Sequence, residues 1–308
     1  MEAGIKRSVS GVVLLDKPRG VSSNAALQRV KFLYKARKAG HTGSLDPLAS
    51  GLLPICLGEA TKISGFLLGG DKSYRFVCRL GVTTTTGDAD GSVIKSHPVV
   101  FSRAQTEDVL QGFIGKIQQI PPMYSALKHE GQRLYRLARQ GIEVERKPRT
   151  VVIHSLDLLR FHDDLMECQV RCSKGTYVRS LAVDIGAVLG CGAHIVELRR
   201  TGVGPYDETR MVSVDLLEAR AEQGLEALDS MLLPVDTAID SWPAVCVDSD
   251  MAHYLRTGQA VFVLHAPSGG WVRLYENGNH QNQIKIIGLG EVMDDGRIAP
   301  RRIIHSPA

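Results

Sequence analysis

One stretch of this sequence carries more information than any other: GHTGSLDPLASG, residues 40–51. Its glycines and the Asp46-Pro47 pair are typical of a turn, so Asp46 taken alone is a turn residue. Its surroundings favour another interpretation. Five Lys and Arg without an acidic residue precede it at residues 29–38, and an apolar segment follows at residues 52–57. A carboxylate on a loop beside a cationic surface is positioned to act on a nucleic acid.

The distribution of charge agrees with a polyanionic partner. The 308 residues carry a net charge of +4, but residues 1–150 hold 23 Lys and Arg against 12 Asp and Glu, a net charge of +11. Residues 201–250 hold 2 against 11, a net charge of −9. A basic first half facing a nucleic acid is one explanation, and ordinary surface variation is the other. The basic residues at 29–38 and 133–149 are accordingly either phosphate contacts or solvated helix faces.

Composition and length exclude several classes of protein. The hydrophobic content of 44% and charged content of 23% are ordinary for globular chains, and 308 residues suggest about two domains. Apolar runs stay below the ~20 residues of a membrane span, and no signal-peptide core is present. The six cysteines lack a Cys-x-x-Cys pair, which argues against a zinc site and fits a reduced cytoplasmic compartment. Cys168 and Cys172 are expected to be buried on one face of a strand.

Periodicity predicts an α+β fold. Alternating polar and apolar residues predict strands at 9–15, 74–80 and 166–172. Capping residues and helical spacing predict helices that start near residues 22–24, at a capping box at 102–105, at residue 132, and around Leu181, Ile185 and Val188. Because the strands alternate rather than form continuous apolar runs, a mixed, mainly antiparallel central sheet is favoured over a doubly wound one.

The sequence pattern changes near residue 240, and this change predicts a domain boundary. Short β-like pieces separated by Gly and Asn follow it, at residues 261–264, 271–275 and 284–289. The sequence therefore predicts a main domain at residues 1–242 and a small β domain at residues 243–308.

The motif at residues 40–51 resembles the central motif of the TruB family of tRNA pseudouridine synthases. Further segments match that family in its order and spacing: GVVLLDKP (11–18), GEATK (58–62), KSYR (72–75), GDADG (87–91), PMYSALK (122–128), RQG (139–141), CSKGTYVR (172–179) and GCGAH (190–194). One such segment could arise by chance, but the ordered set could not. Ser44 and Ser50 depart from the central motif, since many relatives carry Ala and Thr there.

This resemblance implies a fold, a reaction and a partner. It implies a pseudouridine synthase fold with an RNA-contacting insertion around residues 120–150 and a PUA-like RNA-binding domain at residues 243–308. The implied reaction turns uridine 55 in the T loop of tRNA into pseudouridine. The N1–C1′ bond breaks, the base turns, and it is rejoined through C5, after the nucleotide has flipped out of its stack. The T arm of tRNA is the implied partner of a monomeric, cytoplasmic enzyme that needs no protein partner, no cofactor and no metal.

Three residues match the family's catalytic positions. Asp46 is the implied nucleophile, and a carboxylate suits that role because it is ionised at neutral pH without a general base. Arg179 matches the arginine that pairs with the nucleophile, although Asp184 is an alternative local partner. Tyr74 matches the tyrosine that stacks on the target base and takes part in removing the C5 proton. The alternative for Tyr74 is a core aromatic on its strand.

Four further residues match binding positions. Tyr177 and Leu198 match residues that line the uracil pocket, although core packing also explains Leu198. His41 matches a histidine that contacts the RNA loop, with a structural histidine as the alternative. Asp88 is implied to contact the RNA or the pocket, and a hairpin turn is its alternative. The spacing around Asp88 does not fit an EF-hand.

Two functions from different classes remain. One is an enzyme that flips and isomerises a uridine with Asp46. The other is a tRNA-binding chaperone that remodels the T arm, with catalysis secondary. The joint presence of Asp46, Tyr74 and Arg179 favours the enzyme. A nucleotide-binding enzyme is disfavoured because the chain has neither a Gly-x-Gly-x-x-Gly nor a Walker-type loop. Relatives that work with guide RNAs share the central motif, so the range of RNA substrates stays open.

Overall fold

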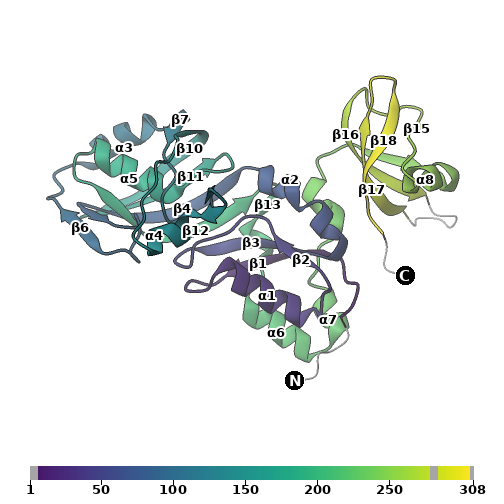
Figure 1. Ribbon diagram of the computed structural model, residues 1–308, viewed down its shortest axis with the longest axis horizontal. Helices are drawn as coiled ribbons and strands as arrows, with labels where there is room; N and C mark the ends of the chain where they lie inside the picture. Colours follow the sequence, from purple (N-terminus) through teal and green to yellow (C-terminus); the bar gives the residue numbers. More distant parts are fainter. Residues whose placement is uncertain (1–5, 278–283, 306–308) are drawn as a thin grey trace.

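The computed structural model describes residues 6–277 and 284–305 of the chain. A nine-stranded sheet forms the larger part, and a five-stranded sheet forms the C-terminal part (Figure 1). In the larger sheet β3 runs parallel to β12, while the other pairs of strands are antiparallel. The predicted α+β fold with a mixed, mainly antiparallel central sheet is therefore confirmed.

The large sheet has the strand order β1-β3-β12-β4-β11-β10-β7, with β2 paired to β3 and β13 to β12. Its strands are β1 (Gly11–Lys17), β2 (Ala39–His41), β3 (Ser50–Leu57), β4 (Lys72–Leu80), β7 (Gly115–Gln119), β10 (Arg149–His162), β11 (Leu165–Cys172), β12 (Ala193–Val203) and β13 (Tyr206–Asp207). Two hairpins lie outside it, β5 (Val82–Thr84) with β6 (Val93–Ser96) and β8 (Lys128–His129) with β9 (Gln132–Arg133).

The α-helices of this part are α1 (Ser23–Leu33), α2 (Ser64–Gly69), α3 (Arg103–Gln111), α4 (Leu134–Arg139), α5 (Val178–Val188), α6 (Val214–Glu222) and α7 (Leu225–Asp229). Helices α1 and α6 pack side by side next to β1 (Figure 1). Helix α5 packs against β12, an inner strand of the sheet. Among the described residues, no helix has both the length and the apolar character needed to cross a membrane.

Strand β4 shows how alternation builds the core. Phe76, Cys78 and Leu80 are at most 1% exposed, whereas Arg75 and Arg79 point to the opposite, solvent-facing side. The buried row packs against α5 and the matching row of β12, which forms the main apolar cluster of the molecule. Tyr74 belongs to the same row but lies near the end of the strand and is only half-buried, so its side chain can reach a cavity.

Several predicted elements are confirmed in detail. The strands at 74–80 and 166–172 lie within β4 and β11, and Cys168 and Cys172 are both fully buried free thiols. Ser22 caps α1 by accepting the N–H of Ala25, and the predicted capping box opens α3.

Other predicted elements need correction. The strand predicted at 9–15 lies at Gly11–Lys17, since its backbone stays paired with β3 up to the turn. The helix predicted from residue 132 begins at Leu134, because Gln132 and Arg133 pair with the preceding hairpin strand. Val188 does not lie on the buried face of α5. It is the last residue of the helix and is 64% exposed.

The five-stranded sheet has the order β14-β16-β17-β18-β15. Its elements are β14 (Ala244–Val247), α8 (Ser249–Arg256), β15 (Val261–Phe262), β16 (Gly270–Asn277), β17 (Ile284–Val292) and β18 (Arg297–Ile303). It has its own apolar cluster, and an aromatic contact of Phe66, Trp242 and Trp271 joins it to the larger part. The β-like pieces predicted after residue 240 are thus strands of a second sheet.

Candidate active site

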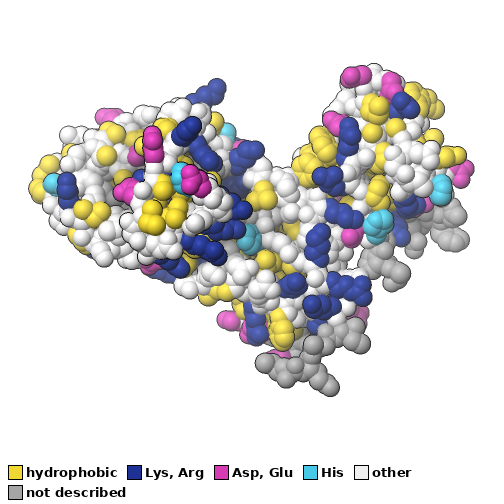
Figure 2. All heavy atoms as spheres, viewed as in Figure 1, with side chains coloured by type: hydrophobic (Ala, Val, Ile, Leu, Met, Phe, Trp, Pro, Cys, Tyr) yellow, Lys and Arg dark blue, Asp and Glu magenta, His cyan; other side chains and the backbone are white. Residues whose placement is uncertain are grey.

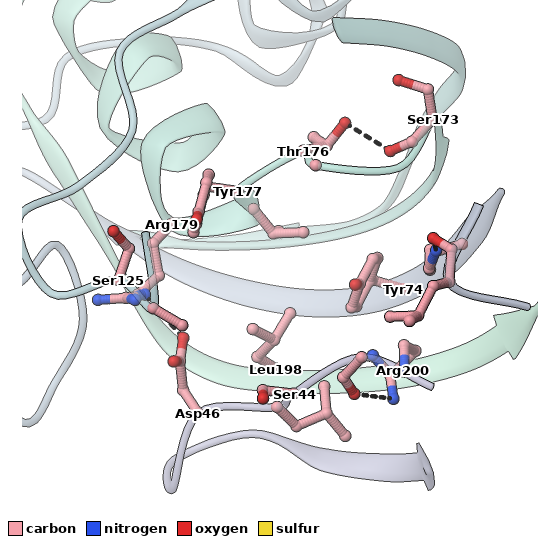
Figure 3. Close-up of a pocket in the computed structure, with 17 residues that line it drawn as sticks. Ser44, Asp46, Tyr74, Ser125, Ser173, Thr176, Tyr177, Arg179, Leu198 and Arg200 are labelled. Carbon is pink, nitrogen blue, oxygen red and sulfur yellow. Dashed lines mark hydrogen bonds and ion pairs between the residues drawn. The ribbon is translucent and has the colours of Figure 1, made fainter. Parts of the chain in front are cut away.

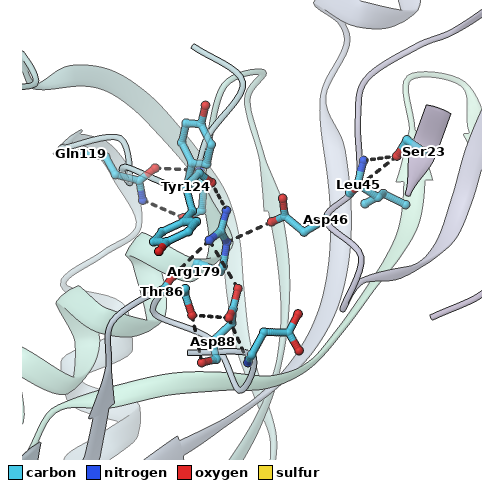
Figure 4. Close-up of polar contacts among 10 residues, drawn as sticks. Ser23, Leu45, Asp46, Thr86, Asp88, Gln119, Tyr124 and Arg179 are labelled. Atoms are coloured by element: carbon cyan, nitrogen blue, oxygen red, sulfur yellow. Dashed lines mark hydrogen bonds and ion pairs between the residues drawn. The ribbon is translucent and has the colours of Figure 1, made fainter. Parts of the chain in front are cut away.

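Asp46 lies on a loop between β2 and β3 that is held rigidly from several sides. Ser23, at the start of α1, is buried, and its hydroxyl both accepts the Leu45 N–H (2.7 Å) and donates to the Leu45 carbonyl (2.9 Å) (Figure 4). The Pro47 carbonyl accepts the N–H of Gly20 (2.7 Å). These bonds flank Asp46 on both sides, so the direction of its side chain is fixed by the backbone.

The carboxylate of Asp46 is ion-paired with Arg179. The Nε of Arg179 lies 2.9 Å from Oδ2 of Asp46, and the arginine side chain is 5% exposed. Its Nη1 donates to the Thr86 carbonyl (3.1 Å) and lies 3.4 Å from Oδ2 of Asp88, and its Nη2 donates to the Tyr124 carbonyl (2.6 Å) (Figure 4). One planar guanidinium therefore connects α5 with three other chain segments, and the carboxylates of Asp46 and Asp88 both lie at its edges.

The alternative partner of this arginine, Asp184, forms no ion pair with it in the described part of the chain. Asp88 is buried, and its carboxylate also accepts hydrogen bonds from the Thr86 hydroxyl and from the N–H of Asp90 (3.2 Å). Asp88 is therefore more than a hairpin-turn residue, because its charge faces the arginine that holds Asp46.

Burial raises the pKa of Asp46, the nearby charge of Arg179 opposes that shift, and the charge of Asp88 adds to it. The side chain of Asp46 is nevertheless 43% exposed. The carboxylate thus lies deep among protein atoms but faces an open space, which is the situation expected of a group that must be reached by a substrate.

That space is a cavity of about 290 Å³ (Figure 3). Tyr74, Tyr177 and Leu198, all expected from the sequence to lie at the site, line it together with Asp46 and Arg179. In Figure 3 Asp46 and Arg179 lie at one end, and Tyr74 and Arg200 lie at the other. A cavity of this size, walled by aromatic and aliphatic side chains with one accessible carboxylate, suits a single flat ring.

A wider groove of about 940 Å³ adjoins the cavity and shares Asp46 and Arg179 with it. His41 and Asp88 line this groove, as do three arginines of the basic segment predicted at 133–149: Arg133, Arg136 and Arg139. The other basic segment does not line it. There Arg29 pairs with Glu218 of α6.

Three buried polar atoms around the site have no hydrogen-bond partner among the described residues: His41 Nδ1, Thr42 Oγ1 and Ser125 Oγ. Burial lowers the pKa of His41, and the charge of Arg200 adds to this, so the ring is neutral at neutral pH. His41 and Ser125 line the groove beside Asp46, whereas Thr42 is fully buried.

The sequence reasoning missed several residues of the site. Lys72 and Arg200 line the cavity, and Lys17 is fully buried nearby. The signal that could have found two of them is alternation, since Lys72 stands two residues before Tyr74 and Arg200 two residues after Leu198, on the same faces of their strands. The described residues contain no group of three or more side chains suited to hold a metal ion.

Gln119 is a further residue that sequence reasoning missed. It is the buried last residue of β7, and it binds both backbone groups of Tyr177: Oε1 accepts the N–H (2.7 Å) and Nε2 donates to the carbonyl (3.0 Å). Tyr177 is the N-cap residue of α5 and makes no side-chain capping bond. Gln119 therefore defines where α5 begins and, with it, the position of Arg179.

Comparisons with known proteins show the family of this chain. Family models described as "TruB family pseudouridylate synthase (N terminal domain)", "tRNA pseudouridylate synthase B C-terminal domain" and "Pseudouridine synthase II TruB, C-terminal" match residues 31–178, 179–240 and 243–304. A Nitrosococcus oceani protein named tRNA pseudouridine synthase B is 58% identical over 97% of this chain and 96% of its own length. A Stutzerimonas stutzeri protein of the same name is 54% identical over 98% of each chain.

Two solved structures share the fold. A chain of a Cbf5-Nop10-Gar1 complex superimposes with a TM-score of 0.70 at 26% identity, covering 96% of this chain and 84% of that chain. A chain of an H/ACA RNP bound to a substrate RNA gives a TM-score of 0.72 at 23% identity, covering 96% and 86%. Fold, site and relatives define the class of this protein as a pseudouridine synthase, an isomerase. Within that class, the chain belongs to the TruB family.

Replacing Gln119 by Ala should loosen the start of α5. The substitution leaves the Tyr177 N–H without its partner, while the Tyr177 carbonyl keeps the N–H of Leu181 (3.0 Å), at a cost of about 1–3 kcal/mol in the free energy of unfolding. Amide hydrogen exchange followed by mass spectrometry should show faster exchange at residues 177–179. Gln118→Ala is the control, because Gln118 is exposed and bonds only the Thr150 hydroxyl (2.9 Å). Unchanged exchange at Tyr177 in the Gln119 variant would contradict this role.

Proposed function

We propose that this chain converts uridine 55 in the T arm of tRNA into pseudouridine, with Asp46 as the nucleophile. The observation that carries the proposal is the ion pair of Asp46 with the buried Arg179, at the junction between a cavity the size of one base and an arginine-lined groove. The full-length relatives named tRNA pseudouridine synthase B support tRNA as the substrate.

The size of the cavity supports base flipping. A space of about 290 Å³ can hold one nucleobase but no stacked helix, so the target uridine has to leave its stack to approach Asp46. Unstacking costs a few kcal/mol, and contacts of the base with Tyr74, Tyr177 and Leu198 offset that cost, since stacking on an aromatic ring contributes about 1–3 kcal/mol. His41 lies in the groove, where the RNA around the flipped nucleotide passes.

The reaction needs an ionised carboxylate beside the sugar. When the N1–C1′ bond breaks, its electron pair leaves with the base, and Asp46 acts on the electron-poor sugar, either by attack at C1′ or through a glycal route. Arg179 keeps the carboxylate ionised and aimed at the sugar. The base then turns and C5 bonds to C1′; where Asp46 has bonded to C1′, that bond breaks and its electron pair returns to the carboxylate. The C5 proton leaves toward Tyr74, and N1 takes up a proton, so uridine and pseudouridine are isomers.

Charge supports the proposed path of the RNA. Lys and Arg side chains gather across the middle of the face seen in Figure 2, and Arg133, Arg136 and Arg139 line the groove. We assign residues 1–242 to a catalytic domain, with an RNA-contacting insertion around 120–150, and residues 243–308 to a PUA-like RNA-binding domain. The proposed enzyme works as a monomer in the cytoplasm, without a protein partner.

Replacing Asp46 by Asn tests the proposed function directly. The substrate is an unmodified tRNA transcript labelled with tritium at C5 of uridine, because the label is released when C5 bonds to the sugar. The wild type should release the label from position 55, and Asp46→Asn should lower the rate by roughly 1,000-fold or more. Binding of tRNA should stay within a few-fold, since Asn has the same shape.

The control is Asp90→Asn, an exposed carboxylate of the same groove. If the wild type binds tRNA but releases no label, the enzyme hypothesis is rejected, and a tRNA-binding chaperone remains as the alternative. Release at an undiminished rate by Asp46→Asn would reject the nucleophile.

The pH dependence of the rate tests the charges around Asp46. The ionised carboxylate is the active form, so the rate falls as the pH drops through the pKa of Asp46, which burial raises. Asp88→Asn removes a negative charge that raises this pKa further, so the acidic limb of the rate profile should move to lower pH. Asp90→Asn should leave the limb in place. A limb that stays fixed or moves upward in Asp88→Asn would contradict the assignment.

A further inference from the structure

Arg200 is the second buried arginine of the cavity, and it differs from Arg179 in having no acidic partner. It lies on β12, is 1% exposed, and forms no ion pair within the part of the chain that the structure describes. Its Nε donates to the Leu52 carbonyl (2.7 Å) and its Nη2 to the Gly43 carbonyl (3.1 Å). Two carbonyls satisfy hydrogen bonds but do not neutralise a buried charge.

Two buried lysines add to this charge. The ammonium groups of Lys17 and Lys72 donate to backbone carbonyls, and neither forms an ion pair in the described residues. Burial lowers the pKa of each to about 8, and the charge of Arg200 acts in the same direction, whereas for Lys17 the charge of Asp46 opposes the shift. This end of the cavity therefore carries more positive charge than its surroundings balance. Such an arrangement stabilises negative charge that forms during a reaction.

Tyr74 is the protein group placed to take up that negative charge. In the antiparallel register of β12 with β4, Arg200 stands directly opposite Tyr74, so both side chains project from the same face of the sheet. Both line the cavity, at the end remote from Asp46 (Figure 3). Burial raises the pKa of the Tyr74 hydroxyl, and the guanidinium of Arg200 opposes this shift. A tyrosine in this cavity would ionise less readily without Arg200.

We propose that Arg200 is a positioning residue for Tyr74, which holds the tyrosine oxygen beside the base and stabilises its ionised form while the C5 proton is removed. This inference rests on the proposed function and deepens it. In the step concerned, the ionised Tyr74 oxygen takes the proton from C5, and the C5–H electron pair forms the C5–C6 double bond. The N1–C6 double bond opens at the same time, and N1 takes a proton from water. The hydroxide left by that water removes the proton from the Tyr74 hydroxyl, which restores the ionised tyrosine.

The same guanidinium also contacts the loop that carries Asp46. Its bond to the Gly43 carbonyl holds a residue three positions before Asp46, while its strand partner is Tyr74. Arg200 thus sets the distance between the group that acts on the sugar and the group that acts on C5. If Arg200 acted only on the loop, replacing it should slow cleavage of the N1–C1′ bond. If Arg200 acts on Tyr74, replacing it should slow removal of the C5 proton.

A kinetic isotope effect separates these two roles. Arg200→Met, Arg200→Lys and the wild type are compared in single-turnover reactions on tRNA carrying hydrogen or deuterium at C5 of uridine 55. Arg75→Met is the matched control, because Arg75 lies on the opposite face of β4 with a side chain 49% exposed. Binding of tRNA and the melting temperature are measured for each variant.

We expect Arg200→Met to bind tRNA within a few-fold of the wild type and to form pseudouridine roughly 10- to 100-fold more slowly. Its isotope effect at C5 should exceed that of the wild type, because proton removal becomes rate-limiting. Arg200→Lys keeps the positive charge but loses the planar guanidinium, so its rate and isotope effect should lie between those of the wild type and Arg200→Met. Arg75→Met should behave as the wild type.

A wild-type rate in Arg200→Met would overturn the inference. So would a slower rate without a larger isotope effect, because Arg200 would then serve bond cleavage or the loop. If Arg200→Met does not fold, Arg200→Lys takes its place. A wild-type rate in that variant, or a slower rate without a larger isotope effect, would then overturn the inference. A wild type that forms no pseudouridine in tRNA overturns the proposed function itself, and this result is distinct because the wild type is measured in the same series.

Discussion

The rest of this structure depends on one buried guanidinium, that of Arg179. A charge removed from water is costly unless several partners compensate for it, and those partners must then stay in place. They come from three separate segments, which are the Asp46 loop, the turn with Thr86 and Asp88, and the segment at Tyr124, while α5 carries the arginine itself. Satisfying one arginine therefore assembles the site, and the sheet and Gln119 serve to hold α5 where this can happen.

The two buried arginines lie at opposite ends of the cavity, and we assign them different electrostatic roles. Arg179 is paired, so its charge favours the ionised form of Asp46 and orients that carboxylate. Arg200 has no acidic partner among the described residues, and in our proposal its field acts on charge that exists only during the reaction. Aromatic side chains also line this cavity. In the proposed reaction they would hold the base without fixing its orientation through many polar contacts, so that it could turn between bond cleavage and bond formation.

Local sequence patterns predicted the helices and strands whose periodicity is regular. They failed where contacts between residues distant in the sequence determine the structure. The alternation in β4 and β11 and the caps of α1 and α3 could be read directly. Strand β10 was missed because register shifts interrupt its alternation. At the site, the ordered motifs predicted roles for Asp46, Tyr74 and Arg179, and the structure brings these three residues to one cavity. The motifs did not reveal Gln119 or Arg200, because the partners of these residues lie across the sheet and are brought near only by tertiary packing.

The most direct test of this account is Arg179→Lys, measured as tRNA binding and as the single-turnover rate of pseudouridine formation. Lysine keeps the charge but cannot contact Asp46, Asp88 and two carbonyls at once. We expect tRNA affinity within a few-fold of the wild type and a rate lower by roughly 100-fold or more. A Lys variant that works at the wild-type rate would show that charge alone suffices, and it would contradict the claim that the planar guanidinium holds Asp46 in place.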